Sequence, residues 1–442
     1  MLKNKLKKIS LFLGDLMILV LALLTTLSLR YGTEFLEVRL EDHLPKFIAV
    51  FAIWLIALYL NDFYNLNFRA WGRDFFKALA GVLLFSTFFS ILYFYLGTDA
   101  VITPKTNLLL FLIISALFFI IWRRLFKLFD KNLLAKDNLA IIGYNEKSDK
   151  LLAEIVRNPG SGYQTALIFK TADELRVLTE KIKEKNIKTI VICDDFGQAN
   201  LLRENLFKCL NLKINFYNYP DFYELLSGKV PVEAIGAEWF LENIKEGERN
   251  YFNAIKNASD FFGALIIFIL SLPFWPLISV VIKLESKGPI FFAQVRVGKN
   301  ETKFKILKFR TMREVGNDKA MTVEGDKRIT PIGNFLRKTR LDEIPQVLNI
   351  LKGEMSFIGP RPERPEFISD LEKAVPFYKT RLLVKPGISG WDQVSGEYHS
   401  ASVDDTLKKL QNDLFYIKNR SLYLDGIIVL KTVAAVLSRG GR

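Results

Sequence analysis

An acidic pair in the last third of this 442-residue chain is the strongest candidate for chemistry. Asp342 and Glu343 stand where apolar residues begin to recur at helical spacing, and Gly353 is a plausible end of that helix. Asp342 is therefore expected at the helix N-cap, with Pro345 tolerated in the first turn. Two interpretations stay open from these residues alone. The pair either serves only to begin a helix, or it places one ionised carboxylate beside a phosphoryl group while the other holds a hard divalent cation.

Cationic residues on either side of the acid pair are suited to binding phosphate. Lys308 and Arg310 belong to the segment KFRTM, in which two cations and a hydroxyl surround one phenylalanine, although a solvated strand end explains that segment equally well. Arg361 stands between two prolines that fix the backbone, so little entropy is lost when its guanidinium grips a phosphate in a fork. A rigid surface loop is the alternative for that segment. A glycine-rich turn, VKPGISGW at 384–391, is weak evidence alone.

Four apolar stretches in the first quarter of the chain predict membrane helices. Half of the residues are hydrophobic, which is rare in soluble proteins, and a helix needs about 20 residues to cross a bilayer core. The second and fourth stretches are short and are expected to extend through aromatic flanks at Tyr64, Trp71 and Phe126, whereas His43 is expected in a solvated loop. The four stretches are Ile9–Leu29, Phe47–Leu60, Ala78–Leu96 and Leu108–Trp122.

The lysines and arginines around these stretches predict their orientation. Eleven of them flank the N-terminus, the second loop and the exit of the fourth helix, against four in the first and third loops. Because cytoplasmic loops carry the excess of Lys and Arg, the N-terminus and everything after Lys131 are expected in the cytoplasm. The net charge of +14 is spread around apolar segments rather than along one stripe, which favours an anionic membrane and phosphorylated substrates over nucleic acid.

Residues 138–219 show the alternating pattern of a parallel α/β domain, with short apolar runs between charged, helix-like stretches. A dinucleotide site needs several glycines after the first strand, where backbone must approach a pyrophosphate, and this loop offers only Gly143. We therefore expect a Rossmann-like domain whose nucleotide site is degenerate, and ordinary buried thiols at Cys193 and Cys209.

A fifth apolar stretch, Phe261–Ile282, contains Pro273 and Pro276 near its middle, where proline removes helix hydrogen bonds and bends the axis. Basic residues lie on both of its flanks, whereas the flanks of a spanning helix should differ in charge. The pattern favours a helix that enters the membrane, breaks and returns to the same face.

The motifs of the last third, taken together and in this order, resemble those of the bacterial polyprenyl-phosphate sugar-1-phosphate transferases, the monotopic phosphoglycosyl transferase superfamily. The resemblance covers the chain from about residue 250 to its C-terminus, and the preceding helices and α/β domain resemble the long form of that family. The matching residues are Gly288-Pro289 with Phe291, Phe292, Gln294, Arg296 and Gly298, then KFRTM, RITPIG, LDEIPQVLNILKGEMSFIGPRP and VKPGISGW, and finally Asp413 with Tyr416.

The resemblance implies roles for the matching residues. Asp342 would attack the sugar-bearing phosphate to give a covalent phosphosugar, and Glu343 would help to place Mg²⁺, although an exchange of these two roles stays open. Arg361 and Arg337 would bind substrate phosphate, as would Lys308 and Arg310 of KFRTM.

Three departures from the family pattern limit what can be carried over. Leu272-Pro273 stands where the family commonly has Ser-Pro, with Ser271 one place earlier, so the implied helix break loses a supporting hydroxyl. Ser389 and Asp392 stand where the family usually has Thr and a small residue. Because their loop is a candidate for shaping the sugar pocket, the identity of the sugar does not follow from the resemblance.

The expected architecture is a membrane protein of the α + α/β class with four parts. Four transmembrane helices occupy residues 1–131, the degenerate Rossmann-like domain 132–245, a linker and the re-entrant helix 246–282, and a mainly helical catalytic domain 283–442. The expected reaction takes a sugar phosphate from a nucleotide-diphosphate sugar, with Mg²⁺, to polyprenyl phosphate at the cytoplasmic face of the bacterial inner membrane, as a step in polysaccharide assembly. A homodimer is expected to form through the α/β domain.

Two other functions compete with this interpretation. A membrane-anchored nucleotide-sugar dehydratase would explain the helices and the α/β domain, but it needs a Tyr-x-x-x-Lys pair, and no tyrosine of this chain has Lys four residues later. A non-catalytic membrane scaffold of polysaccharide export would leave the acid pair and the Pro-Arg-Pro loop without a purpose.

Overall fold

The computed structural model describes residues 2–32, 34, 36–64, 72–96, 105–133, 136–194, 199–244, 246–313, 326–395 and 402–437. The chain forms two compact units, Met1–Leu226 and Ser227–Arg442. The finer division expected from the sequence, with boundaries after residues 131, 245 and 282, stays a prediction.

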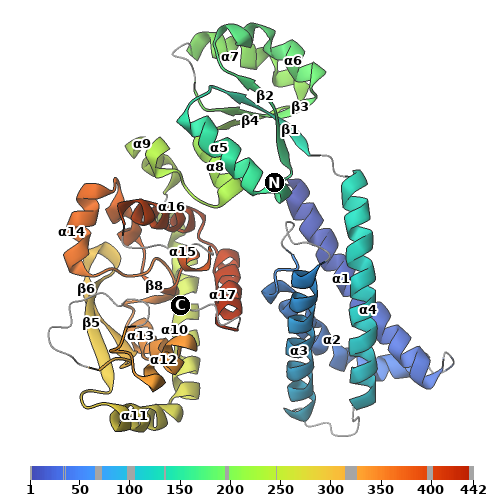
Figure 1. Ribbon diagram of the computed structural model, residues 1–442, viewed down its shortest axis with the longest axis vertical. Helices are drawn as coiled ribbons and strands as arrows, with labels where there is room; N and C mark the ends of the chain where they lie inside the picture. The colour runs from blue at the N-terminus through green and yellow to red at the C-terminus, as the bar shows by residue number, and fades with distance from the viewer. Residues whose placement is uncertain are drawn as a thin grey trace. The chain divides into compact units, whose positions relative to one another are not determined.

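Long apolar helices open the first unit (Figure 1). They pack around buried aromatic side chains such as Phe47, Trp54 and Phe111, while apolar residues such as Leu84, which is 73% exposed, cover the outside. Five helices of the described chain are long and apolar enough to cross a membrane, four here and one in the second unit. The four are α1 (Leu2–Tyr31), α2 (Leu36–Leu60), α3 (Arg73–Leu96) and α4 (Lys105–Leu133).

The second of these helices differs from the prediction at its two ends. It ends at Leu60, before Tyr64, and gains its length at the other end by including Pro45 and His43. His43 is therefore buried in the helix rather than solvated, and its ring nitrogens contact the Arg39 carbonyl and Asn107. Helix α4 does extend through Phe126, and Trp71 lies outside the described residues.

A parallel sheet of four strands, in the order β2-β1-β3-β4, follows in the same unit. Gly143 after β1 has φ 95°, and a Cβ there would lie 2.4 Å from Cβ of Asp194, so this glycine is required by packing. Next to it Asn145 caps the following helix through two backbone amides, and Cys193 and Cys209 are both buried. The elements are β1 (Asp137–Ile142), α5 (Glu146–Arg157), β2 (Tyr163–Phe169), α6 (Leu178–Glu184), β3 (Ile187–Ile192), α7 (Ala199–Lys208), β4 (Asn215–Asn218) and α8 (Tyr219–Ser227).

The second unit is mainly helical, with a two-stranded antiparallel hairpin, β5–β6, and a short parallel pair, β7–β8. Figure 1 shows α10 running the height of this unit with the hairpin and the later helices beside it. The elements are α9 (Ala237–Asn243), α10 (Asn250–Ser271), α11 (Phe274–Glu285), β5 (Phe291–Val297), β6 (Lys303–Phe309), α12 (Pro331–Lys338), α13 (Val347–Leu351), β7 (Ser356–Ile358), α14 (Pro365–Ala374), β8 (Gly387–Ser389), α15 (Trp391–Val394), α16 (Val403–Asn419) and α17 (Leu422–Leu437).

The fifth apolar stretch is interrupted at the prolines. Helix α10 ends at Ser271 and α11 begins at Phe274, with Pro273 immediately before it and Pro276 in its first turn. Figure 1 shows α11 lying across the lower end of α10. Most large apolar side chains on both helices are exposed, including Ile266 at 57% and Leu277 at 69%.

Two motifs near the acid pair are joined by a close backbone contact. Thr330 caps α12 by accepting from the Gly333 amide at 3.0 Å, and its own amide donates to the Thr311 carbonyl at 3.1 Å. A Cβ on Gly333 would lie 2.1 Å from that carbonyl oxygen, closer than any real contact. The RITPIG and KFRTM segments therefore fit together only because position 333 has no side chain.

Replacing Gly333 by Ala should lower the stability of the chain, although alanine normally stabilises a helix by about 1 kcal/mol relative to glycine. The matched control is Gly426→Ala in α17, where an added Cβ meets no atom within 4 Å. Thermal unfolding of the detergent-solubilised chain should show a lower midpoint for Gly333→Ala and an unchanged or higher one for the control. Equal midpoints for the two variants would show that the contact has no structural role.

Candidate active site

The acid pair lies in a 3-10 turn, Leu341–Gln346, directly before α13. Arg340 precedes this turn in the left-handed conformation, with φ 58°, and takes the cap position that the sequence assigned to Asp342. Asp342 and Glu343 instead lie inside the turn, and both are buried. The prediction of Asp342 as N-cap is therefore wrong, because the turn begins two residues earlier than helical spacing suggests, at Arg340.

The hairpin and α13 are held together by the side chain of Asn349, which sets the position of the pair opposite β6. Its Nδ2 donates to the Lys305 carbonyl at 2.8 Å, and its Oδ1 accepts from the Leu307 amide at 3.1 Å. These two bonds place the next residue of β6, Lys308, beside the acid pair.

Glu343 is the centre of a cluster of cations. Its Oε1 accepts from Nζ of Lys308 at 2.6 Å, and guanidinium nitrogens of Arg361 and Arg340 lie 3.7 Å and 3.9 Å from the same oxygen. Burial acts to raise the pKa of Glu343, but Lys308 and then Arg361 outweigh it and lower that pKa to about 2. Glu343 is therefore ionised at neutral pH in this site.

Asp342 lies in a different electrostatic environment from its neighbour. Burial, and next the charge of Glu343, raise the pKa of Asp342, while cations led by Lys308 oppose the rise. Its Oδ1 is buried and accepts no hydrogen bond from the described residues. Of the two acids, Asp342 thus has the higher pKa, and one of its carboxylate oxygens has no hydrogen bond from the described residues.

The four predicted phosphate-binding cations do not all lie at the pair. Lys308 and Arg361 contact Glu343, and the charge of Arg337 acts on Asp342, with its Nε bound to Oγ1 of Thr311 at 2.8 Å.

Arg310 points elsewhere, although KFRTM places it two residues from Lys308. Its Nη2 donates to the carbonyl and Oγ of Ser286, at 2.7 Å and 2.9 Å. Residues two apart in a strand share a face, but Arg310 lies one residue beyond the end of β6 and so does not follow that pattern. Arg310 thus ties the end of β6 to the end of α11. A phosphate-binding role for it stays a prediction.

The Pro-Arg-Pro loop is anchored at every carbonyl from 360 to 363. The amide of Gly387 donates to Pro360 at 3.0 Å, Nη2 of Arg381 to Arg361 at 2.9 Å, Nη1 of Arg296 to Pro362 at 3.1 Å, and the amide of Val297 to Glu363 at 3.0 Å. Rigidity of this loop therefore comes from its hydrogen bonds as well as from its prolines.

Arg381 is a residue of the site that the sequence did not reveal. It is 4% exposed, and the same Nη2 that binds the loop lies 2.9 Å from a carboxylate oxygen of buried Asp413. Asp413 was quoted only as part of the resemblance, and no spacing signal links it to position 381. The pair connects α16 to the loop that carries Arg361.

The proline break is also in contact with strand β6. Nε1 of Trp275 donates to Oγ of Ser271 at 3.1 Å across the break, and its ring packs against Phe309 of β6 with 5.6 Å between ring centroids. Ser271 thus supplies a hydroxyl at the break, one position earlier than in the Ser-Pro pattern.

The glycine-rich turn serves backbone packing. A Cβ on Gly359 would lie 2.3 Å from the Lys385 carbonyl, and one on Gly387 would lie 2.1 Å from the Gly359 amide. Oγ of Ser389 contacts the Thr432 hydroxyl at 2.6 Å, and Asp392 accepts from Asn412 at 3.1 Å. The two residues that depart from the family pattern are thus engaged within the fold.

Comparison with known proteins adds an independent finding. A family model described as bacterial sugar transferase matches residues 251–439. The UDP-N-acetylgalactosamine-undecaprenyl-phosphate N-acetylgalactosaminephosphotransferase of Aeromonas hydrophila is 41% identical over 238 residues, which are 53% of this chain and 55% of the relative. The UDP-glucose:undecaprenyl-phosphate glucose-1-phosphate transferase of Xanthomonas campestris pv. campestris is 32% identical over 327 residues, 68% of this chain and 66% of the relative.

A shorter relative is matched over almost its whole length. The exopolysaccharide production protein PSS of Rhizobium leguminosarum bv. phaseoli is 38% identical over 195 residues, 42% of this chain and 96% of that protein. The chain thus spans between half and two thirds of the first two relatives and nearly all of this one.

Arg381→Lys should loosen the Pro-Arg-Pro loop while keeping the buried charge. One ammonium replaces a guanidinium whose fork binds both Asp413 and the Arg361 carbonyl, so the loop should lose a hydrogen bond worth about 1 kcal/mol. Amide hydrogen exchange in a peptide covering 359–364 should accelerate by roughly fivefold, with peptides from β5 and β6 unchanged.

The matched control for this prediction is Arg364→Lys, since Arg364 pairs at 3.5 Å with the exposed Glu366 beside the same loop. The positioning role of Arg381 is wrong if the loop exchanges at the same rate in both variants, or if protection is lost throughout the unit.

Proposed function

The chain belongs to the bacterial sugar transferase family, and from that premise we propose that it transfers a sugar 1-phosphate from a nucleotide-diphosphate sugar to polyprenyl phosphate. The observation that carries the proposal is Asp342, a buried carboxylate with one oxygen free of hydrogen bonds among the described residues. Cations surround it and Glu343, which is the arrangement needed to receive a diphosphate. The Aeromonas and Xanthomonas relatives are named as transferases that use a UDP-sugar and undecaprenyl phosphate, which supports a UDP-sugar donor.

The proposed reaction has two displacements at one phosphorus. An oxygen of Asp342 attacks the sugar-bearing phosphorus, and the bond to the nucleoside monophosphate breaks, with its electron pair leaving on the monophosphate oxygen. An oxygen of the lipid phosphate then attacks the same phosphorus, and the bond to Asp342 breaks, restoring the carboxylate. The two substrates use one site in turn, so the soluble donor and the membrane lipid need not be bound together.

The geometry favours Asp342 over Glu343 as the nucleophile. Oε1 of Glu343 is held by Lys308 at 2.6 Å, and its low pKa makes it a weak base. The raised pKa of Asp342 makes its oxygen the better nucleophile, and Arg361 and Arg337 are placed to steady charge on the diphosphate as the monophosphate leaves.

Magnesium is the proposed cofactor. The described residues contain no group of three or more His, Cys, Asp and Glu side chains, but Mg²⁺ commonly uses one or two carboxylates and completes its shell with substrate phosphates and water. The orphaned Oδ1 of Asp342 and the adjacent carboxylate of Glu343 fit such a site, with Glu343 as the proposed ligand. When bound, the ion would neutralise charge on the diphosphate.

The membrane arrangement is proposed from the apolar helices. We infer that α1–α4 span the inner membrane and that the catalytic unit lies in the cytoplasm. We also infer that α10 and α11 together form a re-entrant membrane helix, which enters and leaves the membrane on the cytoplasmic side. The α/β segment is proposed as a degenerate Rossmann-like scaffold that forms a homodimer, since its Gly143 loop serves packing against Asp194. A role in exopolysaccharide assembly is supported by the name of the Rhizobium relative, an exopolysaccharide production protein.

Release of nucleoside monophosphate tests the proposed reaction directly. Membranes carrying the chain should release it from one member of a panel of nucleotide sugars. Asp342→Asn should reduce release by roughly 10³-fold or more, because the amide is not a nucleophile. Glu343→Gln should also slow turnover, with partial rescue by extra magnesium. The control Asp370→Asn, on the exposed surface of α14, should behave as wild type; full release by Asp342→Asn would refute the assignment.

The pH dependence should report the raised pKa of Asp342. A protonated carboxyl cannot attack, so the rate of monophosphate release should rise as pH rises through that pKa. This acidic limb of the pH–rate profile should lie at higher pH than the limb of an ordinary carboxyl group. Arg337→Met removes a charge that lowers this pKa, so it should move the limb to higher pH. A limb that stays in place or moves down would contradict the cause given for the shift.

The proposed re-entrant helix predicts that the two flanks of residues 261–282 lie on the same side of the membrane. Single cysteines at Ala258 and Lys287, both exposed, should react with an impermeant thiol reagent from the same side once Cys193 and Cys209 are replaced by Ser. Labelling of the two positions from opposite sides would instead establish a spanning helix.

A further inference from the structure

A second basic pocket lies in the catalytic unit, where the first half of α10 meets the β5–β6 turn, β7 and the end of α16. Its volume is about 70 Å³, enough for several water molecules or one group of phosphate size. Four cations line it, namely Lys256, Lys299, Lys385 and Arg420. None of them belongs to the acid-pair cluster.

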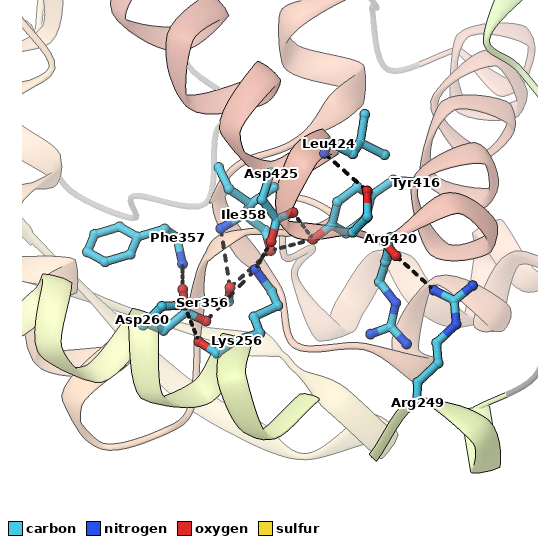
Figure 2. A network of polar contacts seen from close by, with 12 residues as sticks. Arg249, Lys256, Asp260, Ser356, Phe357, Ile358, Tyr416, Arg420, Leu424 and Asp425 are labelled. Atoms are coloured by element: carbon cyan, nitrogen blue, oxygen red, sulfur yellow. Dashed lines mark hydrogen bonds and ion pairs between the residues drawn. The ribbon is translucent and has the colours of Figure 1, made fainter. Parts of the chain in front are cut away.

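One of these cations is neutralised inside the fold. Figure 2 shows Lys256 reaching from α10 to Asp425, with 2.7 Å between Nζ and Oδ2, while the Tyr416 hydroxyl donates to Oδ1 of the same carboxylate at 2.8 Å. Asp260 lies one turn further on, 4.0 Å from Nζ of Lys256. This network forms a fixed wall of the pocket.

Two of the other cations have no such partner. Among the described residues, no carboxylate lies within ion-pair distance of Lys299 or Lys385, and Nζ of Lys385 donates only to the amide oxygen of Asn257, at 3.0 Å. Burial lowers the pKa of Lys385, and the like charges of Lys299 and Lys256 lower it further, against the effect of Asp260. The pocket therefore holds positive charge that an anion would balance.

The wall also offers an acceptor for a hydroxyl group. Oδ1 of Asp260 accepts from the Phe357 amide at 3.3 Å, whereas its Oδ2 is buried and has no hydrogen-bond partner in the described chain. An anion that carries hydroxyl groups would satisfy both the lysines and this oxygen.

The position of the pocket on α10 points to an anion with an apolar tail. One residue after Asp260, the helix begins its exposed apolar surface with Phe261 and Phe262, which are 45% and 62% exposed, and continues to Ile266. A phosphate bound between Lys299 and Lys385 would thus lie where a lipid chain could follow the exposed face of α10.

We propose that this pocket binds the phosphate headgroup of a membrane lipid, with Lys299 and Lys385 as its anion ligands and Asp260 as the acceptor of a headgroup hydroxyl. The occupant is an anionic glycerophospholipid, because the phosphate of the polyprenyl acceptor is proposed to react at the acid pair. Binding of the phospholipid does not rest on the proposed function.

Binding of short-chain phosphatidylglycerol to the purified full chain in detergent tests the site. Retained lipid is counted by native mass spectrometry, with phosphatidylcholine of the same chain length as the zwitterionic comparison. The variant Lys299→Gln/Lys385→Gln should bind phosphatidylglycerol at least roughly tenfold more weakly, because it loses two charged hydrogen-bond donors. Phosphatidylcholine should bind equally to all forms.

The matched control is Lys303→Gln/Lys305→Gln, which removes the same charge from exposed positions on the neighbouring strand β6. It should bind phosphatidylglycerol like the wild type.

Kinetics of turnover then separate the two sources of the phosphate. A higher KM for polyprenyl phosphate with unchanged kcat in the pocket variant would contradict the proposal, because it would make the acceptor the occupant. Loss of phosphatidylglycerol binding with an unchanged KM identifies a structural phospholipid. If the pocket variant matches the control in both lipid binding and KM, the proposal is wrong. Absence of turnover in the wild type would count against the proposed function, and the lipid-binding result would then decide the pocket alone.

Discussion

The buried ion pair between Lys308 and Glu343, with 2.6 Å between Nζ and Oε1, is the interaction on which the site depends. Two charges removed from water are costly unless each is compensated, and a broken buried pair typically costs about 3–5 kcal/mol. Here the pair joins the end of β6 to the turn before α13 and keeps Glu343 ionised. Burial, and next the fixed negative charge of Glu343, raise the pKa of Asp342, so the two adjacent acids have different chemistry.

Backbone anchoring explains why so many glycines and prolines occupy this part of the chain. Gly333, Gly359 and Gly387 each lie where a side chain would overlap a neighbouring backbone atom. Gly359 and Gly387 let the Pro-Arg-Pro loop and the glycine-rich turn approach closely enough for the Gly387 amide to bind the Pro360 carbonyl. A loop held in this way loses little entropy when Arg361 binds phosphate, which is how a partly exposed arginine can act in a defined geometry.

The sequence predicted the acid pair, the helix break and the presence of membrane-length helices, because each depends on local residue types. It did not predict which residue begins the turn, since the left-handed backbone at Arg340 has no signal in helical spacing. It also placed His43 in solvent, because the charged residues 37–46 are typical of a loop, and the contact of His43 with Asn107 of another helix has no signal in the sequence. Arg381 was missed for the same reason, as its partners Asp413 and the Arg361 carbonyl are brought to it only by the fold.

The central claim is that Asp342 forms a covalent bond to the sugar phosphate before the lipid takes part. Full-length chain mixed with its nucleotide sugar in the absence of lipid, quenched in acid and digested, can be mapped by peptide mass spectrometry. The account predicts a mass increase of one sugar phosphate on the peptide containing residues 341–352, with fragmentation placing it on Asp342 and equimolar monophosphate released. An adduct on Glu343, or normal turnover with lipid but no adduct without it, would contradict the account.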